Sequence, residues 1–554
     1  MVLSWDCKFK YLFMKNIIYT AGLAMLILSS CNFLDTDVYG DLNEHSLYHD
    51  EISCMAGLSG IYDKLGAEGT YALNLWAGLD AGSGILVYNR SYGRDNMEVY
   101  NYNYNNTNST IERTWQDLYE GINRANDYII TLNERTEEEC GGAPKKAMFL
   151  AEAKALRALY YMNLVAFWGE VPLRLEVVRD LSHQQLKKSP QVDIYKQIIK
   201  DLLDAEKGCR PADELNAPGR ISQTTAQALL ARAYMWQAGY PVEADTWGEA
   251  LKWAREVKKS KLHQLYKDVD GVNGYRALFI NMCSNKYDLT YRESMFEVEF
   301  YGNGLDKTNE AGRVGLYLGI SQGNTTDSDV PFAYAWYDGT RLLFRMYEEK
   351  DNRKWWNFGD YSYKTIDGKT QKVMFTEEEK AKKKDGNPGK WRAEYDPVRP
   401  WSKNSSSINF PIMRYSDVLL MIAECINEVE GGPTQEAIEA LNEVRLRAGV
   451  DKIALEDFSD VDEFREFIRA ERTRELCFEV PRHMELRRWG KEYFMNRIRM
   501  LADQSYDEEG AKIGYDLADA KAVPALNIAE KHLYLPIPQA ELNTNPTCGQ
   551  NENW

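Results

Sequence analysis

The chain has 554 residues and a formal net charge of −17, from 84 acidic and 67 basic side chains. Hydrophobic residues make up 44% and charged residues 27%, a balance that excludes a disordered chain, a collagen and a coiled coil. The acidic balance argues against nucleic-acid binding, which needs clustered Lys and Arg. Aromatic residues are prominent, with 35 Tyr, 14 Trp and 18 Phe, and tyrosines in such number suit an amphipathic surface.

The first 30 residues have the pattern of an export signal. A mostly apolar run from Ile17 to Leu28 is too short to span a bilayer and suits the centre of a signal peptide. It ends in Leu28-Ser29-Ser30-Cys31, which resembles the lipobox of bacterial lipoproteins. We therefore expect residues 1–30 to be removed and Cys31 to carry the lipid; the alternative is an ordinary secretory signal. Residues 1–13 fit no signal pattern, so we expect translation to begin at Met14.

Residues 32–259 show the three-to-four-residue periodicity of amphipathic helices. Small Ala residues stand beside large aromatic ones, which lets antiparallel helices approach closely. Trp115 and Trp236 lie on apolar helix faces and are predicted to be core residues, and Ser222 is predicted to cap the helix that follows it. Paired helices of this length suggest tetratricopeptide-like hairpins, although there is no clean 34-residue repeat.

Residues 413–554 form a second helical block, and residues 260–412 between the blocks lack periodicity. A charged helix from about Ser459 to Glu479 is predicted to join other helices through salt bridges and not to bind an anion. The middle segment is rich in Gly, Asn, Asp, Tyr and Trp, with one expected strand at Ser294–Tyr301 and a solvated loop or short helix at Thr376–Lys390. A long irregular insertion on a helical scaffold is where binding residues tend to lie.

Five segments, in order along the chain, resemble signatures of the SusD/RagB family of outer-membrane lipoproteins. One departure is Pro481, where a glycine is more usual. The five are Arg157-Ala158-Leu159-Tyr160-Tyr161 with Gly169-Glu170-Val171-Pro172-Leu173, Gly219-Arg220 before Ala226–Arg232, Arg414-Tyr415-Ser416-Asp417, Glu471-Arg472 through Trp489-Gly490, and Leu535-Pro536-Ile537-Pro538.

The resemblance implies a mainly α fold, with tetratricopeptide-like helical hairpins on one side and a large, irregular, loop-rich region with short β segments on the other. Residues 31–554 are then a single domain, made of the two helical blocks and the irregular ligand-loop region 260–412. The resemblance also implies a lipid-anchored outer-membrane protein that faces the cell exterior. Such a protein binds oligosaccharides and delivers them to a SusC-like TonB-dependent transporter for import. The alternative within the family is a peptide-binding member.

Catalytic motifs are missing from the sequence. It contains no G-x-S-x-G elbow, no phosphate-binding G-x-x-x-x-G-K-[ST] loop, no G-x-G-x-x-G and no H-E-x-x-H. The six His residues are scattered without metal-ligand spacing. The sequence therefore favours a binding protein over an enzyme and predicts no catalytic residue, no metal site and no cofactor.

Binding of a sugar calls for flat aromatic rings against its C–H face and polar side chains around its hydroxyls. Two irregular stretches, 76–104 and 300–357, contain both. In the first, Tyr100, Tyr102 and Tyr104 alternate with Asn, as on one face of a strand. The alternative for any single ring is that it packs beneath the loops. The predicted ligand-binding residues are Trp76, Tyr92, Asn96, Tyr102, Tyr301, Trp336, Tyr337, Asp338, Arg341 and Trp355.

Overall fold

The computed structural model describes residues 48–89, 94–177, 185–302, 311–323, 330–479, 481–508 and 510–554. The predicted signal peptide and Cys31 lie outside these ranges. Within them, none of the helices combines the length and the apolar character that crossing a bilayer requires.

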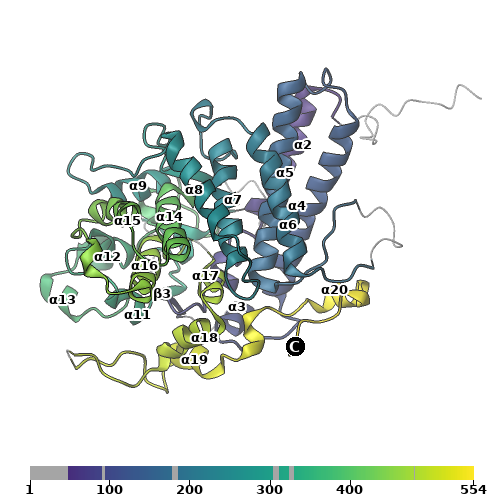
Figure 1. The fold of residues 1–554 in the computed structure, drawn as a ribbon. Coiled ribbons are helices and arrows are strands. Elements are labelled where there is room, and N and C mark those ends of the chain that lie inside the picture. The colour runs from purple at the N-terminus through teal and green to yellow at the C-terminus, as the bar shows by residue number, and fades with distance from the viewer. Residues whose placement is uncertain are drawn as a thin grey trace, which may run out of the picture.

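Antiparallel helices stacked side by side form one half of the molecule. Consecutive helices contact each other in turn from α4 to α8 (Figure 1). They confirm the predicted tetratricopeptide-like hairpins, since each helix buries a stripe against both neighbours. Their bounds are α2 Glu51–Asp63, α4 Ser109–Glu134, α5 Ala143–Trp168, α6 Gln191–Gly208, α7 Gln223–Ala238 and α8 Trp247–Ser260.

The stack continues across the irregular insertion. Helix α14, Tyr415–Glu430, packs against α8 and then against α15 and α16, so the second helical block extends the first. The remaining helices of this block are α15 Gln435–Arg447, α16 Val461–Leu476, α17 Arg482–Arg488, α18 Lys491–Arg499, α19 Val523–Asn527 and α20 Gln539–Thr544.

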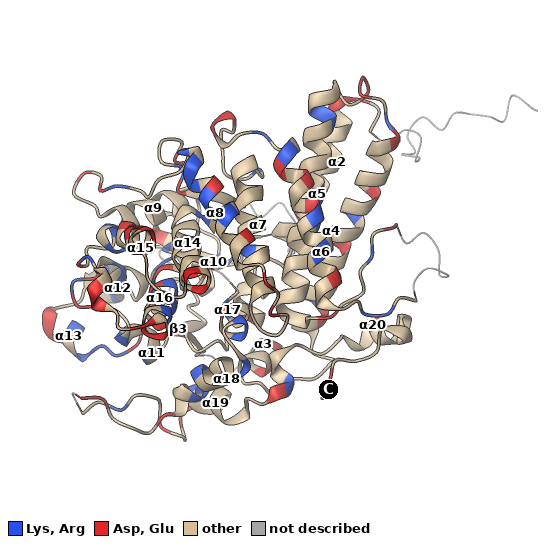
Figure 2. Ribbon diagram, in the orientation of Figure 1, with Lys and Arg blue, Asp and Glu red and all other residues tan. Residues whose placement is uncertain are grey.

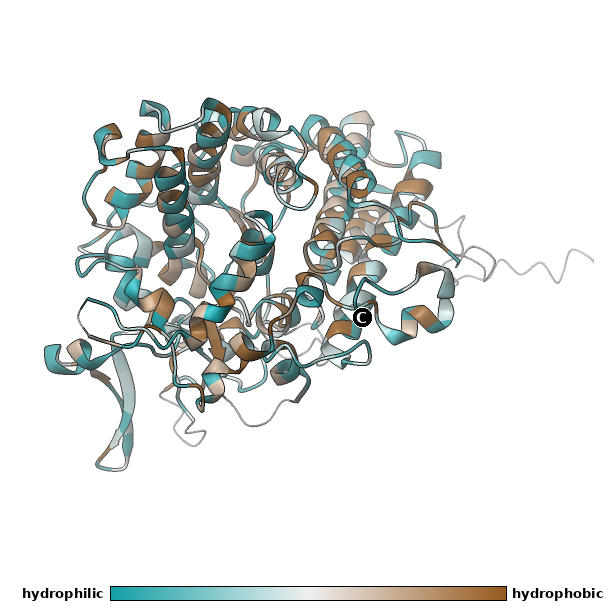
Figure 3. Cartoon of the chain, turned by 60° about the horizontal axis from the view of Figure 1, so that its bottom comes forward, coloured by the Kyte–Doolittle hydropathy of each residue, from teal (hydrophilic) through white to brown (hydrophobic). Residues whose placement is uncertain are grey.

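The irregular region lies at the left of Figure 1, away from α4 to α6. Its described strands form three two-stranded antiparallel sheets, β1–β3, β2–β6 and β4–β5, and two strands project from the body in Figure 3. The strand predicted at Ser294–Tyr301 ends at Val298. The elements are β1 Leu86–Tyr88, β2 Ser294–Val298, β3 Tyr337–Gly339, β4 Tyr361–Ile366, β5 Lys369–Met374 and β6 Phe410–Arg414, with helices α3 Arg94–Tyr100, α9 Gly274–Cys283, α10 Val314–Tyr317, α11 Arg341–Arg345, α12 Asn352–Asn357 and α13 Glu377–Lys382.

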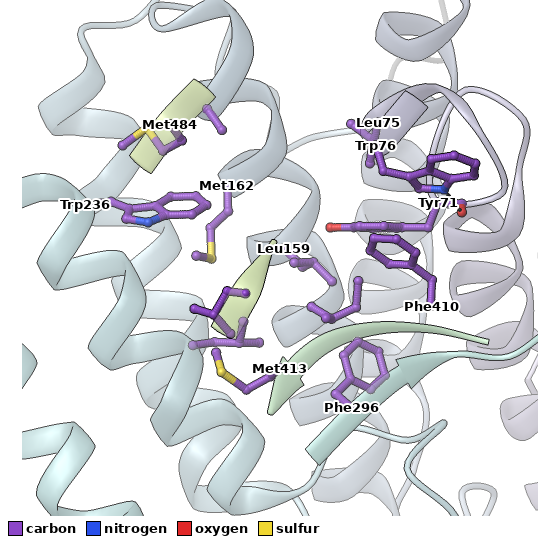
Figure 4. Packing of buried hydrophobic residues seen from close by; sticks show 14 of the residues in the cluster. Tyr71, Leu75, Trp76, Leu159, Met162, Trp236, Phe296, Phe410, Met413 and Met484 are labelled. Atoms are coloured by element: carbon purple, nitrogen blue, oxygen red, sulfur yellow. Dashed lines mark hydrogen bonds between the residues drawn. The ribbon is translucent and has the colours of Figure 1, made fainter. Parts of the chain in front are cut away.

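The core runs between the helical stack and the β2–β6 sheet. In Figure 4, Phe296 and Met413 of the sheet lie in the same buried cluster as Leu159 and Met162 of α5. Trp115 and Trp236 are each 3% exposed, which confirms them as core residues. Burial of this apolar surface is the main force that holds the irregular region to the helices.

Ser222 caps α7 as predicted. Its side chain accepts a hydrogen bond from the backbone N–H of Thr225 at 3.1 Å. We expect Ser222→Ala to lower the free energy of unfolding by about 1 kcal/mol, because an N–H of the first turn loses its acceptor. Chemical denaturation measures this. The exposed Ser59→Ala is the control, and equal effects of the two variants would contradict the capping role.

Buried ion pairs join α14, α16 and α17, as predicted for the charged helix: Arg472 of α16 lies 3.4 Å from Glu424 of α14 and 2.8 Å from Glu485 of α17. Arg414 contacts Glu293 at 2.9 Å and Glu475 at 3.0 Å, with all three side chains at most 1% exposed. Acidic and basic residues stand close together on α13 and α16 in Figure 2. The segment Thr376–Lys390 is solvated only in part. Lys390 is buried, donates to the carbonyl of Cys477 at 2.8 Å and pairs with Glu479, so it belongs to this network.

Candidate functional site

Residues 330–339 present an aromatic face to the surface. Burial alternates along this extended segment: Ala333, Ala335 and Tyr337 are buried, while the residues between them are partly exposed. Successive side chains of extended backbone point to opposite sides. The outward side therefore holds Phe332, Tyr334, Trp336 and Asp338.

Backbone hydrogen bonds fix this segment in place. Ala333 exchanges two bonds with Gln322, at 3.0 Å each, and the N–H of Ala335 donates to Leu316 at 3.1 Å. The carbonyl of Trp336 accepts from Asn89 at 2.9 Å, and β3 then pairs with β1. Ala335 has a left-handed φ of 46°, a conformation that is rare for a residue with a side chain and that concentrates at functional sites.

The rings on this face contact one another. Tyr317, from α10, stacks on Trp336 with ring centroids 4.3 Å apart and planes at 15°. Tyr334 meets the edge of Trp336 at 6.2 Å, and Phe332 meets Tyr334 at 4.5 Å. We refer to Phe332, Tyr334 and Trp336, together with Tyr317, which is buried at 8% exposure and stacks on Trp336, as the aromatic surface. Stacking restrains the rings, so little side-chain freedom remains to be lost when a ligand binds.

Polar side chains border the aromatic surface on two sides. On one side, Arg313 donates to Glu68 at 3.0 Å. On the other, Asn387 donates to Asp338 at 2.7 Å. Burial raises the pKa of Tyr317, and the nearby Arg313 guanidinium partly opposes this effect, so Tyr317 is a neutral phenol at physiological pH. Flat rings beside carboxylate, amide and guanidinium groups match the C–H face and the hydroxyl rim of a sugar.

Three of the predicted ligand residues belong to the core. Trp76 is 5% exposed, donates to the carbonyl of Tyr71 at 2.8 Å and stacks on Phe410 (Figure 4). Tyr102 is 4% exposed and donates to Gly82 at 3.0 Å. Tyr337 is fully buried and donates to the carbonyl of Ala77 at 2.6 Å. These rings offer no face to a ligand, so we assign them to the core and not to the site.

The predicted tyrosine strand at 100–104 is also wrong. Tyr100 ends helix α3, Tyr102 adopts a left-handed φ of 54°, and Tyr104 follows in a loop. All three rings are buried because this loop packs against α17 and the C-terminal segment, where Tyr102 contacts His483 and Tyr104 stacks on Trp554.

The other predicted residues are spread over several places. Asp338 borders the aromatic surface. Arg341 donates to the carbonyl of Gly514 at 3.0 Å, which ties α11 to the C-terminal segment. Asn96, in α3, accepts from the Thr110 hydroxyl at 2.7 Å. Tyr92 lies outside the described residues.

Tyr301 and Trp355 line two different pockets. Tyr301 is 77% exposed and borders a small pocket of about 270 Å³ beside Tyr62 and Gly219. Trp355 is half-buried in a larger pocket of about 710 Å³ next to α13. Among the predicted residues that the structure describes, only Trp336 and Asp338 meet at the aromatic surface.

Sequence reasoning missed Tyr317, Phe332 and Tyr334. A signal for two of them was present, because aromatic residues at 332, 334 and 336 alternate with small or buried ones, the period of a strand with one exposed face. Tyr317 has no such signal, since its pairing with Trp336 arises only when two distant segments meet.

The helical stack and an aromatic surface on the irregular side define a binding protein built on helical repeats. A sequence model of the SusD family matches residues 260–554, and one described as "Starch-binding associating with outer membrane" matches residues 33–237. The first match alone spans more than half of the chain, and this protein therefore belongs to the SusD family.

Relatives match this chain over nearly its whole length. SusD-like protein P25 of Formosa agariphila is 25% identical, over 97% of this chain and 98% of its own length. A SusD homolog from Bacteroides thetaiotaomicron superposes with a TM-score of 0.81 at 25% identity, over 94% of this chain and 100% of that chain. A laminarin-binding SusD-like protein superposes with a TM-score of 0.66 at 23% identity, over 92% and 100%. The last likeness concerns the fold alone.

Proposed function

We propose that this protein binds an oligosaccharide at the aromatic surface and delivers it to a SusC-like TonB-dependent transporter. In this proposal it sits on the outer face of the outer membrane and is held there by lipid on Cys31. Three findings support the proposal: membership of the SusD family, the lipobox-like Leu28-Ser29-Ser30-Cys31, and the partly exposed rings of Phe332, Tyr334 and Trp336.

The observation that carries the proposal is the pair of partly exposed rings Trp336 and Tyr334, with the buried Tyr317 stacked on Trp336. Covering about 100 Å² of aromatic surface contributes roughly 2.5 kcal/mol. Two such contacts, less the cost of ordering a ligand, correspond to a Kd of roughly millimolar. Weak binding of this kind permits release to a transporter.

Isothermal titration against a panel of neutral oligosaccharides tests the ligand class. Laminarin oligosaccharides come first, since a protein of the same fold is described as binding laminarin. We expect at least one glycan to bind. A protein that binds peptides and none of the glycans would replace this proposal with the peptide-binding alternative. Ligand recovered unchanged after long incubation is the expected result for a binding protein, and shortened products would identify an enzyme.

The proposed lipid anchor on Cys31 can be tested separately from ligand binding. We expect Cys31→Ser to move the protein from the membrane fraction to the soluble fraction, because an acyl chain contributes about 0.8 kcal/mol for each buried methylene group. Palmitate labelling and cell fractionation measure this. Cys209→Ser, which changes a cysteine of the mature chain instead, is the control and should leave labelling intact. Labelling of the Cys31→Ser protein would contradict the assignment.

A further inference from the structure

The larger pocket, beside Trp355, is separate from the aromatic surface. It has a volume of about 710 Å³, lies between α11, α12 and α13, and is closed on one side by Asp507 and Glu508. None of the four rings of the aromatic surface lines it. A pocket of this volume is large enough for a small saccharide.

One aromatic ring in the pocket, the indole of Trp355, is positioned to contact a ligand. Trp355 is partly exposed, and Phe344 meets it at 5.7 Å with the planes at 78°, which restrains the indole. The Lys380 ammonium lies 5.7 Å from the centre of the same ring. Trp355 therefore combines an apolar platform with cationic surroundings.

The charges that line the pocket do not cancel. Three of its five basic side chains are paired with acids: Arg345 with Asp507 at 3.1 Å, Lys380 with Glu377 at 2.8 Å, and Lys354 with Glu349 at 2.5 Å. Two basic side chains, Lys383 and Lys384, make no ion pair with a described residue. Among the acidic residues that line the pocket in the described ranges, only Glu508 likewise makes no such ion pair.

Lys383 is the more constrained of the two. Its ammonium lies 4.8 Å from the ring of Phe375. Burial lowers the pKa of Lys383, although Asp338 and Asp385 nearby oppose this effect. An ammonium group withdrawn from water without a direct counter-ion is unfavourable, and an anion that hydrogen-bonds to it removes this cost.

We infer that this pocket is a second saccharide-binding site and that it takes an acidic sugar, whose ring lies on Trp355 and whose carboxylate or sulfate pairs with Lys383 and Lys384. The inference rests on the proposed function, because it assumes a glycan ligand. A chain with a net charge of −17 repels acidic glycans at long range, so their capture requires a local excess of positive charge of this kind.

The test is the double variant Lys383→Gln with Lys384→Gln. Calorimetry at low salt uses three tetrasaccharide probes: a galacturonate with carboxylates, a carrageenan with sulfates, and a neutral galactan. We expect an acidic probe to bind the unchanged protein and to lose affinity about tenfold or more in the double variant, because charge-assisted hydrogen bonds are lost. Trp355→Ala should weaken the same probe.

Lys382→Gln is the matched control, since Lys382 is the neighbouring residue at the end of α13, is mostly exposed and does not line the pocket. Comparison of the two acidic probes shows whether binding requires a carboxylate or a sulfate group. Binding of neither acidic probe, or equal binding to the double variant, overturns the inference. If a neutral glycan still binds in a Trp336-dependent manner, only this second site fails; if no glycan binds at all, the proposed function fails with it.

Discussion

Replacing Arg414 with Met is expected to lower the free energy of unfolding by about 3–5 kcal/mol. The Arg414 guanidinium donates to Glu293 at 2.9 Å and to Glu475 at 3.0 Å, and it contacts Glu479 through two nitrogens. Methionine fills similar space but leaves these carboxylates with fewer partners in a buried site. The uncompensated negative charge, and not the lost contact area, is the source of the effect.

Urea denaturation of the two proteins measures this difference. Arg255→Met is the matched control, because Arg255 also forms a two-point pair, with Glu436, but both partners are 40–45% exposed. An exposed pair contributes about 1 kcal/mol or less. Equal losses in the two variants would show that the buried network has no special importance for stability.

The same network makes stability depend on pH. Burial alone would raise the pKa of Glu471, but the guanidiniums of Arg353, Arg474 and Arg445 outweigh it and hold that pKa at about 2. The unfolded chain has the ordinary Glu value of 4.5 and so binds a proton first as the pH falls. This stabilisation is therefore complete above about pH 4.5 and is lost toward pH 2. Thermal unfolding across that range should show a falling midpoint.

The helical half of the fold was predictable because each helix carries its own signal. Trp115, Trp236 and Ser222 occupy the expected core and cap positions, since helical periodicity and capping act over a few residues. The packing of α14 on α8, by contrast, could not be predicted from such local signals. It joins segments separated by the whole irregular region, and periodicity contains no information on which helix becomes a neighbour.

The candidate site was predictable only in composition. The candidate site does consist of aromatic residues from an irregular stretch. The aromatic residues of these stretches nevertheless differ in exposure, since Trp76, Tyr102 and Tyr337 are buried while Tyr334 is partly exposed. Side-chain type does not decide between these outcomes, because a tyrosine ring packs in a core as well as on a sugar. The decision depends on tertiary contacts, such as the β1–β3 pairing that turns Tyr337 inward and Trp336 outward.

Replacing Trp336 with Ala is expected to weaken oligosaccharide binding by roughly 70-fold. The indole supplies the larger ring of the stacked pair, and loss of about 100 Å² of apolar contact corresponds to roughly 2.5 kcal/mol. The carbonyl of Trp336 that accepts from Asn89 belongs to the backbone and remains in the variant. Trp336→Phe keeps a smaller flat ring and should give an intermediate affinity, which distinguishes ring contact from a general disturbance of the site.

Trp253→Ala, on α8, removes an indole of the same size outside the aromatic surface and is the control for loss of a tryptophan. We expect it to bind the oligosaccharide as the unchanged protein does. Titration calorimetry supplies the affinities, and circular dichroism verifies that each variant is folded. If Trp336→Ala and Trp253→Ala bind equally well, the ligand does not rest on the aromatic surface. The binding site would then have to be sought among the remaining exposed rings, of which Tyr301 is the most accessible tyrosine in the described part of the chain.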